Sequence, residues 1–225
     1  MKYHIITFGC QMNKSDSERL AAVLENLGYQ KTNDEKSADL IAIVACSVRQ
    51  SAVNRIYGLL NQKSKIKGQN DKLKCKIILT GCLMPKDEKV LRNRVDLIIN
   101  IKDMGKLPQL LGIKNYELRI KDYLNIKAKY SNSFSAYIPI STGCDNYCSY
   151  CVVPYVRGPE TSRPAEEIIN EVKCLIKKGY KEITLVGQNV NSYHGKIKNQ
   201  KSKVKSQNDK SKVKNYKFSR ITEND

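Results

Sequence analysis

The sequence predicts an α/β protein whose strands form a parallel sheet covered by helices. Along the first hundred residues, short apolar runs alternate with amphipathic stretches, and the alternation starts again after residue 135. Three of the apolar runs also end in a cysteine, directly before the next amphipathic stretch. Alternation of strand and helix is typical of parallel sheets, because each crossover between parallel strands needs a long connection, usually a helix.

The first strand and helix are predicted between residues 4 and 28. HIITFGC (residues 4–10) is a mostly apolar run that predicts a strand. Ser15 and Glu18 form a capping-box pattern that predicts a helix start, and Gly28 predicts the helix end. The apolar side chains of this helix recur at helical spacing, at Leu20, Val23, Leu24 and Leu27.

The next units continue the same alternation. DLIAIVAC (residues 39–46) is apolar almost throughout, as expected for a strand that is buried on both faces. KIILTGC (76–82) and DLIINI (96–101) predict further strands. Helices are predicted between them, one carrying Ala52, Ile56, Leu59 and Leu60 and one in PKDEKVLRNRV (85–95).

A second α/β unit is predicted after a polar stretch. LRIKDYLNIKAKYSNSF (118–134) is expected to be a linker or a peripheral hairpin. AYIPIST (136–142) and EITLVGQNV (182–190) predict two strands. The helix between them is predicted to start at the cap Ser162 and to stop at Gly179, with an apolar stripe of Ile168, Val172, Leu175 and Ile176.

The formal net charge of +18 is concentrated in two segments. QKSKIKGQNDKLK (62–74) and QKSKVKSQNDKSK (200–212) are identical at ten of thirteen positions, so they form a low-complexity repeat. Residues 62–76 carry +5 and residues 196–225 carry +7, which leaves +6 on the other 180 residues. We expect solvated, disordered segments there, with a phosphate-binding tail as the alternative.

The amino terminus and the cysteines bear on the compartment. The first apolar run stops at Gly9, which makes it too short for a secretory signal or a membrane span. A soluble, cytoplasmic protein with no membrane partner is therefore expected. Without an export signal, the eight cysteines favour metal ligation over disulfides.

Cys10, Cys46 and Cys82 each end a predicted strand, at regular intervals of 36 residues. In a parallel sheet the carboxyl ends of the strands lie along one edge, so these thiols are expected to converge on one crevice. A lone cysteine at a strand end is more often a small buried residue. Three in register favour a shared ligand.

A second group of thiols lies in STGCDNYCSYCVVP (141–154), where Cys144, Cys148 and Cys151 share one loop with no fourth cysteine nearby. A 4Fe-4S cluster is normally held by four cysteines. Three cysteines would leave one iron open to a substrate or cofactor, just as a catalytic metal keeps an open position.

Zinc is the alternative to iron and sulfide at this loop. A zinc site would need a distant fourth ligand such as Cys174 or His194. Otherwise Cys174, in the middle of a predicted helix, and Cys75, in the basic repeat, are interpreted as structural or incidental.

The spacing of the loop cysteines resembles the signature of radical S-adenosylmethionine (SAM) enzymes, and the wider sequence resembles the tRNA methylthiotransferase family. Within that family it is most similar to the enzymes that add a methylthio group at C2 of N6-isopentenyl-adenosine 37. The resemblance covers about residues 3–195, apart from the basic insertion. Five blocks carry it, in the family's order: TFGCQMNKSDSE (7–18), CSVR (46–49), TGC (80–82), GCDNYCSYCVVPYVRGPETSRP (143–164) and TLVGQNVNSY (184–193).

The resemblance implies SAM and two 4Fe-4S clusters as cofactors. One SAM would methylate sulfur associated with an auxiliary cluster, and another would give a 5'-deoxyadenosyl radical that abstracts hydrogen from adenosine C2. The implied partners of the monomeric protein are tRNA, at the anticodon-loop adenosine 37, and an electron donor such as a flavodoxin or ferredoxin. The implied ligands are Cys10, Cys46 and Cys82 for the auxiliary cluster and Cys144, Cys148 and Cys151 for the SAM-cleaving cluster.

Six further residues are weaker candidates for contacts with SAM, and each could equally serve the fold. Tyr150 is the aromatic residue immediately before the last cysteine of the loop. Arg157 and Arg163 could bind a carboxylate or phosphate through two N–H groups. Three residues lie where a SAM-facing loop is expected, at the end of the last predicted strand: Gly187, Gln188 and Asn189.

The predicted fold class is therefore α/β, with an amino-terminal parallel-sheet (flavodoxin-like) domain followed by the start of a radical SAM partial α/β barrel. Because the family continues through more barrel strands and a small β domain, this chain is expected to be truncated, with a poorly stable second half. The expected parts are a domain at 1–117 with a basic insertion at about 62–76, a linker at 118–134, a truncated domain at 135–195 and a basic tail at 196–225.

Other functions stay open. The chain could be a non-catalytic iron-sulfur or zinc binding module, an electron carrier, a methylthiotransferase acting on another substrate, or a basic RNA-binding protein without chemistry. Three plus three thiols argue against an electron carrier, whose irons are normally all bound by cysteine.

Overall fold

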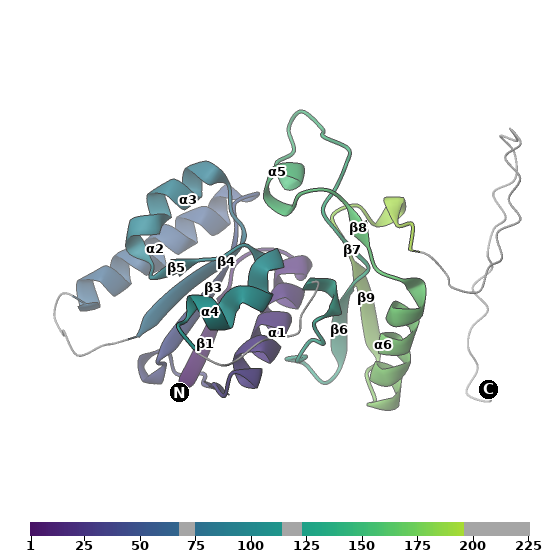
Figure 1. Cartoon of the computed structure of the whole chain (residues 1–225), viewed down its shortest axis with the longest axis horizontal. Helices are drawn as coiled ribbons and strands as arrows, with labels where there is room; N and C mark the ends of the chain where they lie inside the picture. The colour runs from purple at the N-terminus through teal and green to yellow at the C-terminus, as the bar shows by residue number, and fades with distance from the viewer. Residues whose placement is uncertain (68–74, 114–122, 196–225) are drawn as a thin grey trace, which may run out of the picture.

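The computed structural model describes residues 1–67, 75–113 and 123–195. A five-stranded sheet with helices on both faces makes up the first part, and a smaller α/β unit lies beside it (Figure 1). The basic tail at 196–225, which was expected to be disordered, lies outside the described residues.

The sheet of the first part is parallel, with the strand order β2-β1-β3-β4-β5. This is the order of flavodoxin-like folds, so the prediction for the amino-terminal part is confirmed. The strands are β1 (Lys2–Thr7), β2 (Gln30–Lys31), β3 (Leu40–Cys46), β4 (Lys76–Cys82) and β5 (Leu97–Ile98).

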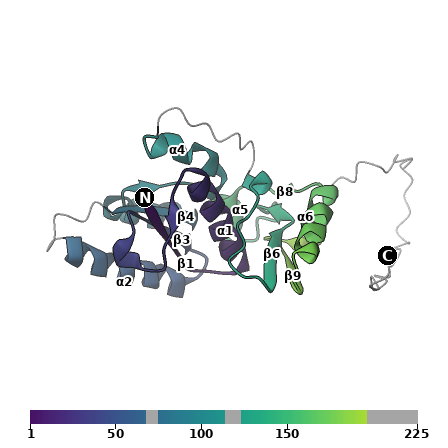
Figure 2. The same cartoon turned by 90° about the horizontal axis from the view of Figure 1, so that it is seen from below.

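Helices cover the two faces of this sheet (Figure 2). One face packs against α1 (Gln11–Asn26), the 3-10 helix η3 (Ile101–Lys106) and α4 (Leu107–Leu110). The other packs against α2 (Gln50–Lys67) and α3 (Pro85–Leu91). Further 3-10 helices are Glu35–Ser37, Arg92–Arg94 and Val190–Ser192.

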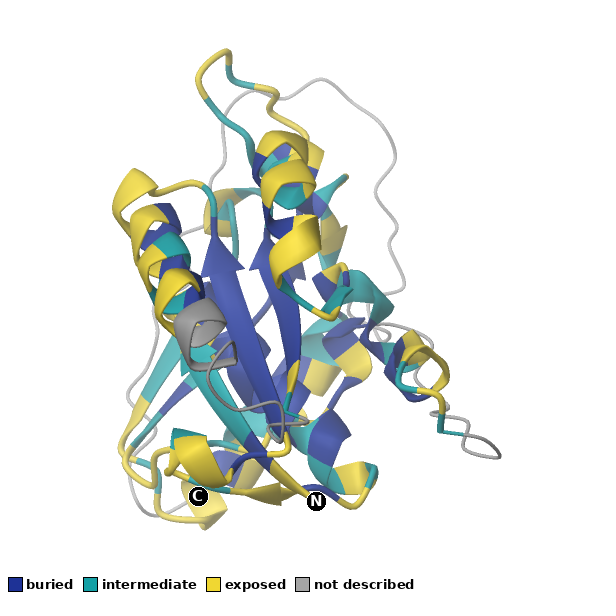
Figure 3. Ribbon diagram, turned by 90° about the vertical axis from the view of Figure 1, so that its left-hand side faces the viewer, coloured by how far each residue is buried: buried dark blue, intermediate teal, exposed yellow. Residues whose placement is uncertain are grey.

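Strand β3 is buried along its whole length, as its apolar sequence predicted. Ala42 and Val44 face the core under α1, whereas Ile43 and Ala45 face the core under α2. Figure 3 shows the central strands as the buried interior between more exposed helices. Because both faces are packed, the carboxyl end of β3 is held in a fixed position.

Helix α1 starts five residues earlier than the capping-box pattern predicted. Its N-cap is Cys10, whose backbone N–H donates to Asn13 Oδ1 at 3.3 Å. Ser15 lies within the helix, and its hydroxyl donates to the carbonyl of Tyr137 in the second unit at 3.1 Å. Glu18 accepts hydrogen bonds from Ser131. The polar residues that suggested a cap therefore join α1 to the second unit and to the polar stretch before it.

The second unit contains two parallel strands, β6 (Ser135–Pro139) and β9 (Glu182–Val186), and the helix α6 (Ala165–Lys177). Its small core consists of Ala136, Ile138, Ile140, Ile168 and Leu175. Between β6 and α6 the chain forms β7 (Ser141–Thr142), a loop with three cysteines, α5 (Val153–Arg157) and β8 (Thr161–Ser162). Strands β7 and β8 pair antiparallel.

Two details of this unit differ from the sequence prediction. The strand predicted at 136–142 is divided into β6 and β7. Ser162 is not the cap of α6, because it pairs with Ser141 in the β7–β8 ladder, and the helix starts after Pro164. The predicted stop at Gly179 is confirmed, since this residue has φ of +88° just after the helix.

The polar stretch before β6 is packed into the protein over residues 123–126 rather than peripheral. It forms the 3-10 helix η4 (Tyr123–Asn125) and buries Tyr123, Leu124 and Ile126 in the core under α1. Residues 118–122 of the expected linker lie outside the described part. The expected domain boundaries stay a prediction.

Both ends of the basic insertion expected at about 62–76 lie in described elements, and its extent stays a prediction. Residues 62–67 are the last part of α2, and Lys76 already belongs to β4. Residues 68–74 lie outside the described part of the chain. Among the helices that the structure describes, none has the length and apolar character needed to cross a membrane.

Candidate functional site

The carboxyl edge of the first sheet brings Cys10, Cys46 and Cys82 into one region, as predicted. Cys46 and Cys82 are register partners on the adjacent strands β3 and β4. Cys10 follows β1, which pairs with the other side of β3. A Cβ atom placed on Gly9 would lie 2.9 Å from the Cβ of Cys46, so the start of α1 runs directly beside this strand end.

Cys82 contacts a buried ion pair. The Nε of Arg157, on α5, donates to Cys82 Sγ at 2.9 Å. The Nη1 and Nη2 atoms of the same guanidinium donate to the carboxylate of Asp16 on α1, and the side chains of this pair are fully buried. Burial raises the pKa of the Cys82 thiol to about 11, although the adjacent guanidinium acts in the opposite direction.

The second cysteine triad lies in one loop between β7 and α5. Cys144 is buried, whereas Cys148 and Cys151 are half-buried. The loop is closed by hydrogen bonds from Cys144 N–H to the carbonyl of Gly158 at 3.2 Å and from Cys151 N–H to that of Cys148 at 2.9 Å. Tyr147 has φ of +45°, the only non-glycine residue of the described chain in this left-handed region.

The thiols fit the chemistry of iron-sulfur clusters. No disulfide joins the eight cysteines, all of which lie in the described residues. One set of three lies at the ends of β3 and β4 and at the N-cap of α1, and the other lies in the loop after β7. Thiolate sulfur is the donor that such clusters use. No group of three His, Cys, Asp or Glu side chains in the described residues is arranged to hold a metal ion. The ligand assignment therefore stays a prediction.

The structure places three of the weaker candidates, Gly187, Gln188 and Tyr150, beside the three-cysteine loop. Gln188 Oε1 accepts a hydrogen bond from the N–H of Gly143 at 2.7 Å, directly before Cys144. Gly187 packs against Ser141, since an added Cβ would lie 2.6 Å from its Oγ. Asn189 starts the final 3-10 helix. Tyr150 is 88% exposed beside Cys148 and Cys151.

Both candidate arginines are buried and bonded within the protein. Arg157 binds Asp16 and Cys82, as described above. Arg163 Nη1 donates to the carbonyl of Pro139 at 3.1 Å and to Glu171 Oε2 at 2.6 Å. These contacts favour a structural role for Arg163 and leave its role in SAM binding a prediction.

Sequence reasoning missed the partners of Arg157. Asp16 is fully buried, accepts from both terminal nitrogens of Arg157 and accepts a hydrogen bond from the hydroxyl of Tyr123. Asp16 lies in a run of polar residues, KSDSE (14–18), which suggested a helix cap. One feature of the sequence could have indicated Asp16 as a partner: it is a carboxylate on a helix face that is otherwise expected to be buried.

Cys174 and His194 were the candidates for the fourth ligand of a zinc site. The contacts recorded for them include none of the three loop cysteines. Cys174 is exposed on α6. His194 Nδ1 lies 3.5 Å from Glu160 Oε1, and its side chain is 68% exposed. Neither residue adds to the case for zinc.

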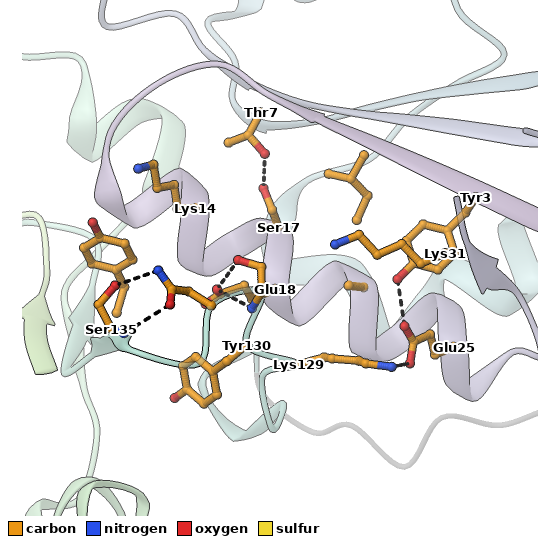
Figure 4. Close-up of a pocket in the computed structure, with 15 residues that line it drawn as sticks. Tyr3, Thr7, Lys14, Ser17, Glu18, Glu25, Lys31, Lys129, Tyr130 and Ser135 are labelled. Carbon is orange, nitrogen blue, oxygen red and sulfur yellow. Dashed lines mark hydrogen bonds and ion pairs between the residues drawn. The ribbon is translucent and has the colours of Figure 1, made fainter. Parts of the chain in front are cut away.

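A pocket of about 480 Å³ lies between α1, β1 and residues 129–137 (Figure 4). Glu25 accepts from the hydroxyl of Tyr3 at 2.9 Å and pairs with Lys129. Burial raises the pKa of Glu18, which lines the same pocket. The described residues that line this pocket include no cysteine, so it is separate from both triads.

Comparison with known proteins gives two family matches. Residues 2–100 match the profile described as "Uncharacterized protein family UPF0004", and residues 138–219 match that of the radical SAM superfamily. The sheet that presents Cys10, Cys46 and Cys82 thus falls in the first match, and the loop with Cys144 falls in the second. The second α/β unit is the start of a radical SAM domain.

Several curated relatives carry the name tRNA-2-methylthio-N(6)-dimethylallyladenosine synthase. The protein of Dictyoglomus thermophilum is 41% identical over 206 residues, which are 85% of this chain and 46% of the relative. The protein of Finegoldia magna is 39% identical over 210 residues, 88% of this chain and 45% of the relative. The chain spans about half the length of the curated relatives it matches. By its two domains and these relatives, the chain belongs to the radical SAM tRNA methylthiotransferase family.

Proposed function

We propose that the protein takes part in methylthiolation of tRNA, at C2 of N6-isopentenyl-adenosine 37, with SAM and two 4Fe-4S clusters. The single observation that carries this proposal is the presence of two sets of three thiols, one at the carboxyl edge of the sheet and one in the loop after β7. The names of the relatives support tRNA as the substrate.

Cys144, Cys148 and Cys151 would hold the SAM-cleaving cluster. When bound there, a cluster with three protein ligands would leave a position for SAM and would supply the radical chemistry that an unactivated ring carbon requires. The chain's own contribution is to fix the loop. Gly143 and Gln188 tie it to the end of β9, and Cys144 is held by the carbonyl of Gly158. SAM would then lie beside residues 187–189.

Cys10, Cys46 and Cys82 would hold the auxiliary cluster. When bound there, this cluster supplies the sulfur chemistry of the transfer. The chain's part is positional, because β3 and β4 are packed on both faces and fix two of the thiols in register. The cap of α1 fixes the third through the contact of Cys10 with Asn13.

The target adenosine is proposed to enter as an unstacked anticodon-loop base. A loop base can be splayed into a pocket with less loss of pairing and stacking than a base in a duplex. An electron donor such as a flavodoxin or ferredoxin, a monomeric state and a cytoplasmic location complete the proposal.

The test is reductive cleavage of SAM by the full chain, reconstituted with iron and sulfide without oxygen. We expect 5'-deoxyadenosine from the wild type and from Cys174→Ala, a matched control that removes an exposed thiol outside both triads. Cys148→Ala should abolish cleavage, and Cys10→Ala should retain it. Cleavage by Cys148→Ala would contradict the assignment of the loop.

A second assay addresses the substrate. The same preparations are incubated with tRNA that contains N6-isopentenyl-adenosine, and the nucleosides are analysed by mass spectrometry. The proposal predicts the 2-methylthio nucleoside with wild type, and none with Cys10→Ala or Cys148→Ala. Cleavage of SAM without this product would favour another substrate, and iron binding without cleavage would favour a non-catalytic iron-sulfur module.

A further inference from the structure

Arg157 connects the two cysteine regions. Besides its ion pair with Asp16, it donates a hydrogen bond to the sulfur of Cys82. It ends α5, six residues after Cys151, and its guanidinium reaches the first sheet. There it contacts Asp16 on α1 and Cys82 on β4. The side chain therefore runs from the three-cysteine loop to the thiols at the sheet edge.

The nitrogens of the guanidinium have two different partners, a carboxylate and a thiol. The Nη1 and Nη2 atoms face the Asp16 carboxylate, with Nη1 3.3 Å from Oδ1, and the hydroxyl of Tyr123 also donates to Asp16. Held by this fork, the Nε–H is directed at Cys82 Sγ, 2.9 Å away. A lysine could not make both contacts, because it carries a single donor nitrogen at the end of a flexible chain.

The burial of these groups makes their charges effective. Arg157 and Asp16 are at most 1% exposed, so water screens their charges little. Hydrogen bonds to cluster sulfurs and the net charge near a cluster set its reduction potential. A buried cation that donates to a ligand sulfur favours the reduced cluster, which carries one more negative charge, and a buried anion disfavours it.

Resting on the proposed function, we propose that Arg157 is a positioning residue that tunes the auxiliary cluster. Its guanidinium donates to the ligand sulfur of Cys82 and raises the cluster's reduction potential, while Asp16 orients the guanidinium and partly offsets its charge. The same contacts fix α5, and with it the three-cysteine loop, against the auxiliary site. This assigns Arg157 to the auxiliary cluster rather than to SAM.

The experiment is a potentiometric titration of the full chain, in a background where Cys144, Cys148 and Cys151 are replaced by Ala so that one cluster is observed. Iron content and the electron paramagnetic resonance spectrum are recorded for each variant. Arg157→Met is expected to shift the midpoint potential to more negative values, and Arg157→Lys to recover part of the shift. Asp16→Asn is expected to shift it to more positive values.

Arg163→Met is the matched control. It also removes a buried guanidinium from an ion pair, with Glu171, but the contacts of Arg163 include no thiol. Its potential and spectrum should equal those of the parent. If the role of Arg157 were merely structural, Asp16→Asn and Arg157→Met would not shift the midpoint potential in opposite directions.

The outcomes separate this inference from the proposed function. Equal potentials in the parent, Arg157→Met, Arg157→Lys and Asp16→Asn at full iron content would overturn the inference alone. If Arg157→Met fails to fold, the opposite shifts expected for Arg157→Lys and Asp16→Asn decide the question. A parent chain that binds no iron would overturn the auxiliary cluster itself, and the inference with it.

Discussion

Replacing Gly143 by alanine tests how the three-cysteine loop is held. This glycine has φ of +83°, and an added Cβ would lie 2.0 Å from the carbonyl oxygen of Pro159 and 2.5 Å from that of Gly158. Both obstacles are backbone atoms, which cannot rotate away. The same segment also holds Cys144, whose N–H donates to the carbonyl of Gly158. The substitution should therefore loosen the loop.

The magnitude follows from two contributions. Placing alanine in the left-handed region costs about 1–2 kcal/mol, and forcing packed backbone apart typically costs about 1–3 kcal/mol. The lower entropy of the unfolded alanine chain offsets about 0.4–1 kcal/mol. The net loss is about 1–5 kcal/mol, and a loss of 2 kcal/mol within this range raises the population of the open loop by about 30-fold.

The assay is alkylation of Cys144 in the metal-free, reduced chain, followed by peptide mass spectrometry. Cys144 is only 7% exposed, so its labelling reports opening of the loop. Gly179→Ala is the matched control, because Gly179 has φ of +88° but nothing within 4 Å of an added Cβ. We expect labelling to rise at least about 5-fold in Gly143→Ala, the factor that corresponds to about 1 kcal/mol, and hardly at all in Gly179→Ala. Equal labelling in the two variants would refute the reasoning.

Three further substitutions test the packing of the molecule. Leu79→Ala, at a fully buried position of β4, should lower the free energy of unfolding by about 2–5 kcal/mol in urea titrations. Tyr123→Phe removes the hydrogen bond to Asp16 and should cost about 1–3 kcal/mol by the same assay. For Glu171, burial alone would raise the pKa, but Arg163, Tyr130 and Arg19 together outweigh it, so the pKa is lowered. This carboxylate therefore stabilises the fold above its unfolded pKa, and the advantage of wild type over Glu171→Gln should shrink as the pH falls through the folded pKa; a pH-independent difference would contradict the ion pair.

The sheet and the thiols at its edge could be predicted because they follow from local patterns. An apolar run such as residues 39–46 can be buried on both faces only inside a covered sheet, and it ends in Cys46. Parallel strands bring their carboxyl ends to one edge. The grouping of Cys10, Cys46 and Cys82 therefore needed only the strand assignments.

Contacts between distant segments could not be predicted in this way. Ser15 forms part of a capping-box pattern, but its hydroxyl bonds Tyr137 from within α1, so tertiary contacts replaced the local cap. Ser162 likewise pairs in a strand ladder. The Asp16–Arg157 pair joins residues 141 positions apart, and no local periodicity encodes such a partner.

The account depends on two sets of three thiols that each hold an iron-sulfur cluster, and metal analysis measures this directly. After reconstitution without oxygen, the full chain should contain about eight iron and eight sulfide ions, four of each per cluster. Cys46→Ala and Cys148→Ala should each lose about half of both, whereas Cys174→Ala should lose none. A folded wild-type chain that binds zinc and no iron, or no metal at all, would contradict the account.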